Sequence, residues 1–164
     1  MDNIFYKHLS MLKNQAGNLL YINRLIPIIM TNTKALNKTT AKKVLVVEDE
    51  PDAREIFIDI LTSEGLVVEG AVGGIEALEK MMTGKFDLVL LDIVMPDKDG
   101  VQTLAEIKKD PAKYGNSKIV MLTNIGGDLA VDKAMQLGAN GYMLKSETEP
   151  AELVAIVKKY LELS

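Results

Sequence analysis

From residue 44 onward, the chain alternates between short apolar runs and segments with helical spacing. The runs, each expected to form a strand, cover residues 44–47, 66–71, 88–91, 118–122 and 141–144. The intervening segments place apolar residues three or four positions apart and predict helices near residues 51–63, 75–83, 101–109, 128–137 and 150–161. Five strand–helix units in succession predict an α/β fold: a five-stranded parallel sheet flanked by five helices, with right-handed crossovers.

The third apolar run is the most informative, because an acid follows it directly. Residues 88–91 are apolar at every position, which is typical of a strand buried on both faces. Asp92 comes next, and the chain then breaks through Pro96 into the turn-forming sequence DKDG. We therefore expect Asp92 at the carboxyl end of its strand, the edge of an open α/β sheet where ligands bind.

Four more polar residues stand at the ends of other predicted strands. Glu48 and Asp49 follow the first strand, Thr123 ends the fourth and Lys145 follows the fifth. In a parallel sheet these side chains should converge on Asp92. Two carboxylates about 4 Å apart repel by roughly 4 kcal/mol at an intermediate dielectric constant, so the three acids require a cation. Carboxylate, carbonyl and water ligands favour Mg²⁺ over zinc, and Lys145 adds a second positive charge.

This set of residues predicts the transfer of a phosphoryl group to a carboxylate. Asp92 is the best nucleophile because it is the central acid, whereas Glu48 and Asp49 are adjacent and suited to holding the metal ion. The hydroxyl of Thr123 and the ammonium of Lys145 can each donate a hydrogen bond to a phosphoryl oxygen.

Residues 43–163 resemble a response-regulator receiver domain of the CheY-like type. The segments that carry the resemblance are, in order, VLVVED, LVLLDIVMPDKDG, VMLTN and GANGYMLK. The resemblance implies a flavodoxin-like fold with strand order 2-1-3-4-5 and a receiver domain over residues 42–164.

The resemblance also implies a role for each candidate residue. Asp92 is the expected phosphoacceptor, and Glu48, Asp49, Asp92 and the backbone carbonyl of Val94 are the expected Mg²⁺ ligands. The residues expected to bind the phosphoryl group or to switch with it are Thr123, Lys145 and Tyr142, with Tyr142 as the aromatic rotamer switch. The residues expected to modulate access to the site are Val94, Asn124 and Ile125.

Two positions depart from the family pattern. Ser146 replaces the proline that usually follows the lysine, so the Lys145–Ser146 peptide bond should be trans. Asn124 replaces the small residue that usually follows Thr123. We expect Asn124 to alter the lifetime of the phosphoryl group, either by crowding it or by donating a hydrogen bond.

The implied function is signalling by phosphoryl transfer. The donor would be a sensor histidine kinase or a histidine phosphotransfer protein. The face of the fourth helix, fifth strand and fifth helix would then contact a downstream protein or a second copy of the chain. Such a domain catalyses only its own Mg²⁺-dependent phosphorylation and dephosphorylation, so we do not expect an enzyme.

Two alternatives stay open: a receiver-like binding module without phosphoryl turnover, and an aspartyl-nucleophile phosphatase. The haloacid-dehalogenase type of phosphatase would require a second Asp where Val94 stands.

Charge and composition exclude several other classes. Residues 1–43 carry a net charge of +6, which leaves −10 on the rest of a chain whose total is −4. An acidic body disfavours direct nucleic-acid binding, which needs clustered Lys and Arg. The chain has no cysteine, which excludes disulfides and is consistent with a cytoplasmic protein. No apolar run approaches the length of a transmembrane helix.

The first 41 residues form a basic leader and linker in our interpretation, partly disordered because Thr, Asn, Lys and Ala dominate its second half. One hypothesis is that translation begins at Met30. The alternative is that residues 4–29 form a basic amphipathic surface for a membrane or a partner helix, although Pro27 interrupts its helical pattern. The chain ends soon after the last predicted helix, so we expect a stand-alone receiver.

Overall fold

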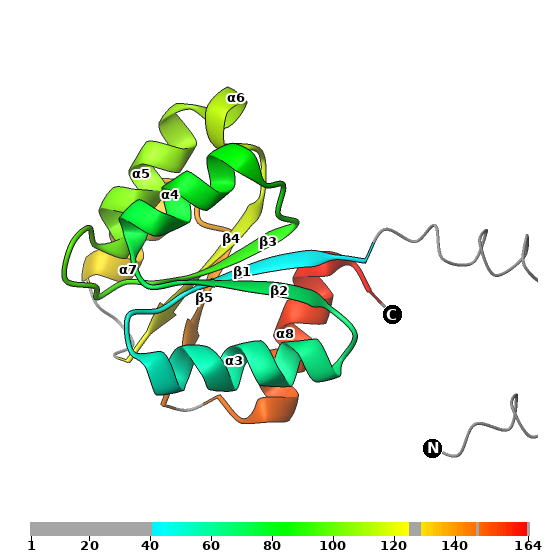
Figure 1. Cartoon of the computed structure of the whole chain (residues 1–164). Coiled ribbons are helices and arrows are strands. Elements are labelled where there is room, and N and C mark those ends of the chain that lie inside the picture. The colour runs from blue at the N-terminus through cyan, green and yellow to red at the C-terminus, as the bar shows by residue number, and fades with distance from the viewer. Residues whose placement is uncertain (1–40, 125–128, 147, 164) are drawn as a thin grey trace, which may run out of the picture. The chain divides into compact units, whose positions relative to one another are not determined.

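A computed structural model describes residues 41–124, 129–146 and 148–163. Its sheet confirms the predicted strand number, direction and order, with the parallel strands arranged β2-β1-β3-β4-β5 (Figure 1). The strands are β1 (Lys43–Val47), β2 (Val67–Ala71), β3 (Leu88–Asp92), β4 (Lys118–Thr123) and β5 (Gly141–Leu144). The leader predicted over residues 1–41 lies outside the described residues, except for Ala41.

The register of the sheet brings the ends of the inner strands together. Val47 of β1 lies beside Leu91 of β3, and Asp92 at the end of β3 lies beside Leu122 of β4. Thr123, the last residue of β4, lies beside Leu144 of β5. The residues that end or follow these strands therefore reach the same edge of the sheet.

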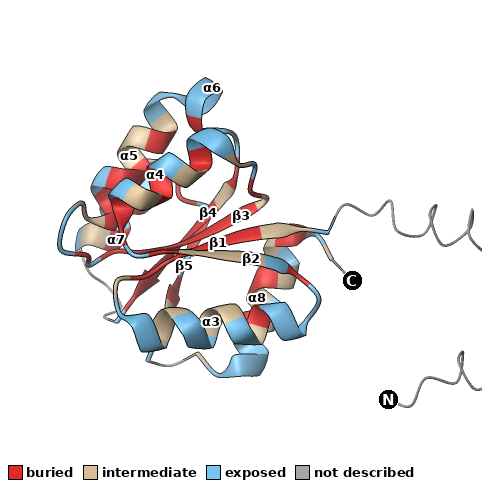
Figure 2. Ribbon diagram, viewed as in Figure 1, coloured by how far each residue is buried: buried red, intermediate tan, exposed pale blue. Residues whose placement is uncertain are grey.

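Helices cover both faces of the sheet (Figure 1). On one face lie α3 (Pro51–Ser63) and α8 (Pro150–Leu161), and on the other lie α4 (Gly74–Thr83), α5 (Gly100–Lys109) and α7 (Leu129–Gln136). The inner strands are buried along most of their length (Figure 2). Their alternate residues divide between two cores. One core contains Leu45, Val47, Val89, Leu91 and Met121, and the other contains Val44, Val46, Leu88, Leu90 and Val120. Each fully buried Val or Leu side chain contributes about 1.5–3 kcal/mol.

A short helix, α6 (Pro111–Tyr114), adds to the five predicted helices. Asp110 and Pro111 follow the helix predicted near residues 101–109 and are expected to end it, because the residue before a proline disfavours helix. In the structure Asp110 also caps the new one, because its side chain accepts a hydrogen bond from the Lys113 N–H at 3.1 Å. Pro111 occupies the first helical position, where its fixed φ is favourable and its missing N–H costs nothing. In the described part of the chain, none of the helices has the length and hydrophobicity needed to cross a bilayer.

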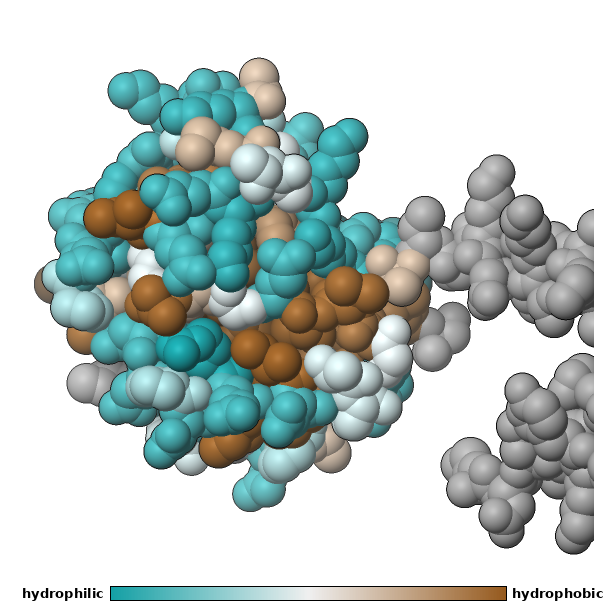
Figure 3. Space-filling model, viewed as in Figure 1, coloured by the Kyte–Doolittle hydropathy of each residue, from teal (hydrophilic) through white to brown (hydrophobic). Residues whose placement is uncertain are grey.

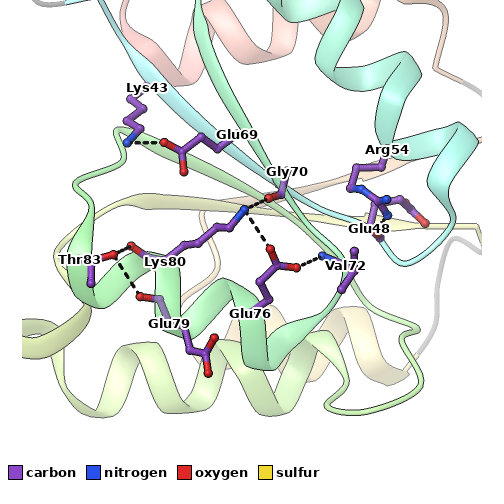
Figure 4. Close-up of polar contacts among 10 residues, drawn as sticks. All are labelled: Lys43, Glu48, Arg54, Glu69, Gly70, Val72, Glu76, Glu79, Lys80 and Thr83. Carbon is purple, nitrogen blue, oxygen red and sulfur yellow. Dashed lines mark hydrogen bonds and ion pairs between the residues drawn. The ribbon is translucent and has the colours of Figure 1, made fainter.

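Strand β2 forms one edge of the sheet, and its apolar side chains are visible between α3 and α4 as a brown patch in Figure 3. Val67 is exposed on this edge and Val68 is partly buried. Side chains cover several polar groups around the strand (Figure 4). Lys43 pairs with Glu69 at 2.7 Å, and Lys80 donates a hydrogen bond to the carbonyl of Gly70. The contact of Lys80 occupies a backbone carbonyl of this edge strand that another strand could otherwise pair with.

Candidate functional site

Three acids lie close together at the carboxyl edge of the sheet. Glu48 and Asp49 follow β1, and the Glu48 N–H donates to the Ala71 carbonyl at 3.1 Å, which ties this turn to β2. One carboxylate oxygen from each of Glu48, Asp49 and Asp92 lies within 4.8 Å of the others. Glu48 is fully buried and Asp92 is only 3% exposed. The sheet therefore holds three carboxyl groups in one cluster, two of them almost completely buried.

Lys145 lies between two of these acids. Its Nζ donates to Glu48 Oε2 at 2.9 Å and to Asp92 Oδ2 at 3.0 Å. The backbone positions the side chain, because the Lys145 N–H donates to the Thr123 carbonyl at 2.8 Å and continues the β4–β5 pairing. The structure thus brings together residues that are almost a hundred positions apart in the sequence.

Burial, together with the hydrogen bonds and charges of this cluster, shifts the pKa values of two residues. Burial raises the pKa of Glu48 above its usual value, and the charge of Asp92 adds to this effect, while the hydrogen bond from Lys145 opposes it. Burial lowers the pKa of Lys145, but its hydrogen bonds to Glu48 and Asp92 outweigh burial and raise the pKa overall. Lys145 therefore stays protonated, and one ammonium compensates only part of the acidic charge.

The donor atoms suit a hard divalent cation. All three side chains offer carboxylate oxygens, the ligands that Mg²⁺ prefers. Glu48 Oε1 is buried and has no hydrogen-bond partner among the described residues. A buried carboxylate oxygen without a partner is costly, so it points to a ligand such as a metal ion. The residues present are compatible with Mg²⁺ at this site.

A glycine allows α5 to begin directly against the backbone of Asp92. The Gly100 N–H donates to the Ile93 carbonyl at 2.9 Å, and a Cβ atom on Gly100 would lie 2.1 Å from the Asp92 carbonyl oxygen. Asp99 caps the same helix by accepting a hydrogen bond from the Gln102 N–H at 2.7 Å. The sequence DKDG predicts a turn, and its glycine before a helical segment could have indicated this close approach.

The structure describes most of the remaining predicted site residues. Thr123 is buried at the end of β4, and Asn124 after it is exposed. The Val94 N–H lies 3.4 Å from Asp92 Oδ1, and the Val94 side chain is 74% exposed. Tyr142 on β5 is 49% exposed. Their assigned roles, including the Val94 carbonyl as a metal ligand, stay predictions, and Ile125 lies outside the described residues.

The two departures from the family pattern lie beside the cluster. Ser146 is exposed directly after Lys145, as Asn124 is after Thr123. The described residues contain no cis peptide bond, so the Lys145–Ser146 bond is trans as expected.

Sequence reasoning missed one further residue near the acids. The Arg54 guanidinium, on α3, donates to the Glu48 carbonyl at 2.7 Å (Figure 4). Its position one turn into a predicted helix gave no sign that it would reach back to the turn before the helix.

Comparison with known proteins agrees with the resemblance found in the sequence. The family model of the response regulator receiver domain matches residues 44–158. The chemotaxis protein CheY of Halobacterium salinarum is 38% identical over 116 residues, which cover 71% of this chain and 94% of that protein. The transcriptional regulatory protein CpxR homolog of Haemophilus influenzae is 37% identical over 122 residues, which cover 74% of this chain. The match covers 51% of that regulator, so this chain spans about half of its length.

A solved structure extends the similarity to three dimensions. The response regulator protein TrrA of Thermotoga maritima, in complex with Mg²⁺–BeF, matches with a TM-score of 0.62 and 38% identity. The match covers 73% of this chain and 98% of TrrA.

Proposed function

Because this chain belongs to the response-regulator receiver family, we propose that Asp92 accepts a phosphoryl group from a phosphohistidine of a partner protein. The partner would be a sensor histidine kinase or a histidine phosphotransfer protein. The observation that carries the proposal is the contact of the Lys145 ammonium with both Asp92 and Glu48, in a cluster that Asp49 completes. This contact provides a permanent positive charge at the nucleophile.

The transfer exchanges one bond to phosphorus for another. A carboxylate oxygen of Asp92 attacks phosphorus, and the bond to the donor imidazole nitrogen breaks. The electron pair stays on the imidazole nitrogen, which then takes a proton from solvent. Mg²⁺, when bound, neutralises charge on the transferring phosphoryl oxygens.

The protein's own residues bind and orient the reacting groups. Glu48 and Asp49 would hold the metal ion together with Asp92 and the Val94 carbonyl. Lys145 would donate a hydrogen bond to a phosphoryl oxygen, as would the hydroxyl of Thr123. Burial of Asp92 limits access of bulk water to its carboxylate.

The output would be a change in protein contacts. A phosphoryl group adds about two negative charges, which Thr123 and Lys145 can engage only if the loops after β4 and β5 move. We place the responding surface on α7, β5 and α8, where Tyr142 is half exposed. A downstream protein or a second copy of the chain would bind this surface. Complete switching requires about 5.5 kcal/mol of differential stabilisation, so partner binding would supply part of this free energy.

The cytoplasm is the proposed location, which the lack of cysteine supports.

Phosphorylation by a small donor tests the proposal directly. The full chain is incubated with acetyl phosphate and Mg²⁺, and its intact mass is measured. We expect an adduct of one phosphoryl group that is absent from Asp92→Asn and from samples with EDTA. A wild-type protein that binds Mg²⁺ but forms no adduct would favour a binding module, and hydrolysis of many equivalents of an added phosphoester would favour a phosphatase.

A further inference from the structure

The turn that carries two of the acids is tied to α3 by one side chain. The Arg54 Nη1 atom donates to the Glu48 carbonyl at 2.7 Å (Figure 4). It also donates to the Asp49 carbonyl at 3.3 Å. The backbone N–H of Arg54 donates to the Glu50 carbonyl at 3.0 Å. Arg54 therefore contacts three consecutive carbonyls of the segment that connects β1 to α3.

A glycine on the edge strand makes room for this side chain. A Cβ atom on Gly70 of β2 would lie 3.1 Å from Arg54 Cδ and 3.4 Å from Arg54 Cγ. It would also lie 3.0 Å from Ile58 Cδ1. The distances of 3.0 and 3.1 Å are tighter than ordinary van der Waals contacts, so the Arg54 stem crosses β2 where no side chain obstructs it. Glycine weakens a strand, and this crossing gives a physical reason for one here.

We propose that Arg54 is a positioning residue for the carboxylates of Glu48 and Asp49, and that Gly70 supplies the space it needs. The inference rests on the proposed function, because it concerns the same cation site. Arg54 points at backbone carbonyls, and its hydrogen bonds limit the rotation of the backbone that carries both carboxylates. Residues that orient metal ligands without contacting the metal themselves typically contribute 10- to 100-fold to metal affinity.

The charge of Arg54 makes the proposal distinguishable from a simple electrostatic effect. A guanidinium near the site repels a divalent cation, so loss of this charge alone would tighten Mg²⁺ binding. Loss of a positioning contact would weaken it. The two explanations predict changes of opposite sign for Arg54→Gln.

The test compares three variants with two controls in the full, unphosphorylated chain. Arg54→Gln removes the guanidinium, Arg54→Lys keeps the charge without the fork of donors, and Gly70→Ala keeps Arg54 but crowds its stem. Lys80→Gln removes a nearby positive charge that contacts Gly70 and not the turn. Gly73→Ala adds a methyl group that meets no atom within 4 Å. Isothermal titration calorimetry measures the Mg²⁺ dissociation constant.

We expect Arg54→Gln and Gly70→Ala to raise the dissociation constant about tenfold. Arg54→Lys should fall between them and the wild type, and both controls should stay within about twofold of it. Thermal unfolding in EDTA establishes that each variant is folded. Unchanged or tighter Mg²⁺ binding by folded Arg54→Gln would overturn the proposal, as would a normal affinity in Gly70→Ala.

A second measurement needs no metal ion. Amide hydrogen exchange of Asp49 and Glu50 in EDTA reports on the mobility of the turn, and Arg54→Gln should accelerate it while Lys80→Gln leaves it unchanged. Equal exchange in Arg54→Gln and the wild type would contradict the positioning role. If the wild type binds Mg²⁺ but acetyl phosphate does not modify it, the phosphoacceptor function fails while the role of Arg54 still stands.

Discussion

Lys145 is the residue whose removal should most disturb the charge balance of the site. Its Nζ lies 2.9 Å from Glu48 Oε2 and 3.0 Å from Asp92 Oδ2, and both acids are almost completely buried. At an effective dielectric constant of about 20, each contact corresponds to about 5–6 kcal/mol of attraction before desolvation is subtracted. Removing one partner of a buried ion pair costs about 3–5 kcal/mol. We expect Lys145→Met to lower the free energy of unfolding by about 3–5 kcal/mol at pH 7 in EDTA.

The deficit of Lys145→Met, meaning its loss of unfolding free energy relative to the wild type, should depend on pH. The interactions of Lys145 oppose the burial that raises the pKa of Glu48, so their loss raises that pKa further in the folded state. The reference value for an unperturbed Glu is 4.5. A carboxyl whose pKa is higher in the folded state costs stability above that pKa, and the cost disappears below the unfolded value. The deficit should therefore be largest near neutral pH and shrink as the pH falls towards 4.

Guanidinium denaturation followed by circular dichroism measures this effect, with and without Mg²⁺. Mg²⁺ should recover part of the loss, because a ligand at 100 times its dissociation constant adds about 2.7 kcal/mol. Lys158→Met is the matched control, since Lys158 pairs with Glu64 at 2.8 Å on the surface and should contribute less than about 1 kcal/mol. A Lys145→Met deficit no larger than that of the control, or one that is constant between pH 4 and 7, would refute the reasoning.

Two further substitutions test the same region. Glu48→Gln should raise the free energy of unfolding in EDTA at pH 7, because burial raises the pKa of Glu48 and its ionised form costs stability there. This gain in stability should vanish below pH 4.5. Denaturation curves at both pH values check this. Gly100→Ala should cost about 1–3 kcal/mol or more, since its Cβ would lie 2.1 Å from the Asp92 carbonyl oxygen. It should also slow phosphorylation by acetyl phosphate. Gly73→Ala should change neither the stability nor the rate of phosphorylation. Equal stability of the two alanine variants would contradict the close approach of Gly100 to Asp92.

The sequence alone determined the architecture. Four apolar residues in a row at 88–91 required burial on both faces, and that pattern recurs between helical segments in a way that only a parallel sheet with helices on both sides satisfies. Glu48, Asp49, Asp92, Thr123 and Lys145 followed from the same reasoning, because parallel strands end at one edge. The strand order and the other candidate residues came from the family resemblance. Asp92 and Lys145 could be assigned to a common site without coordinates, since each follows an apolar strand.

Tertiary structure decided what depends on the distance between parts of the backbone. The contact of Arg54 with the turn before its helix, the space that Gly70 provides and the approach of Gly100 to Asp92 are separations of a few ångströms that no local pattern records. Likewise, only the coordinates reveal that Glu48 Oε1 has no hydrogen-bond partner among the described residues. Hydrophobic periodicity specifies which face of an element is buried, but it does not specify how closely two elements approach, and that distance sets hydrogen bonds and steric room.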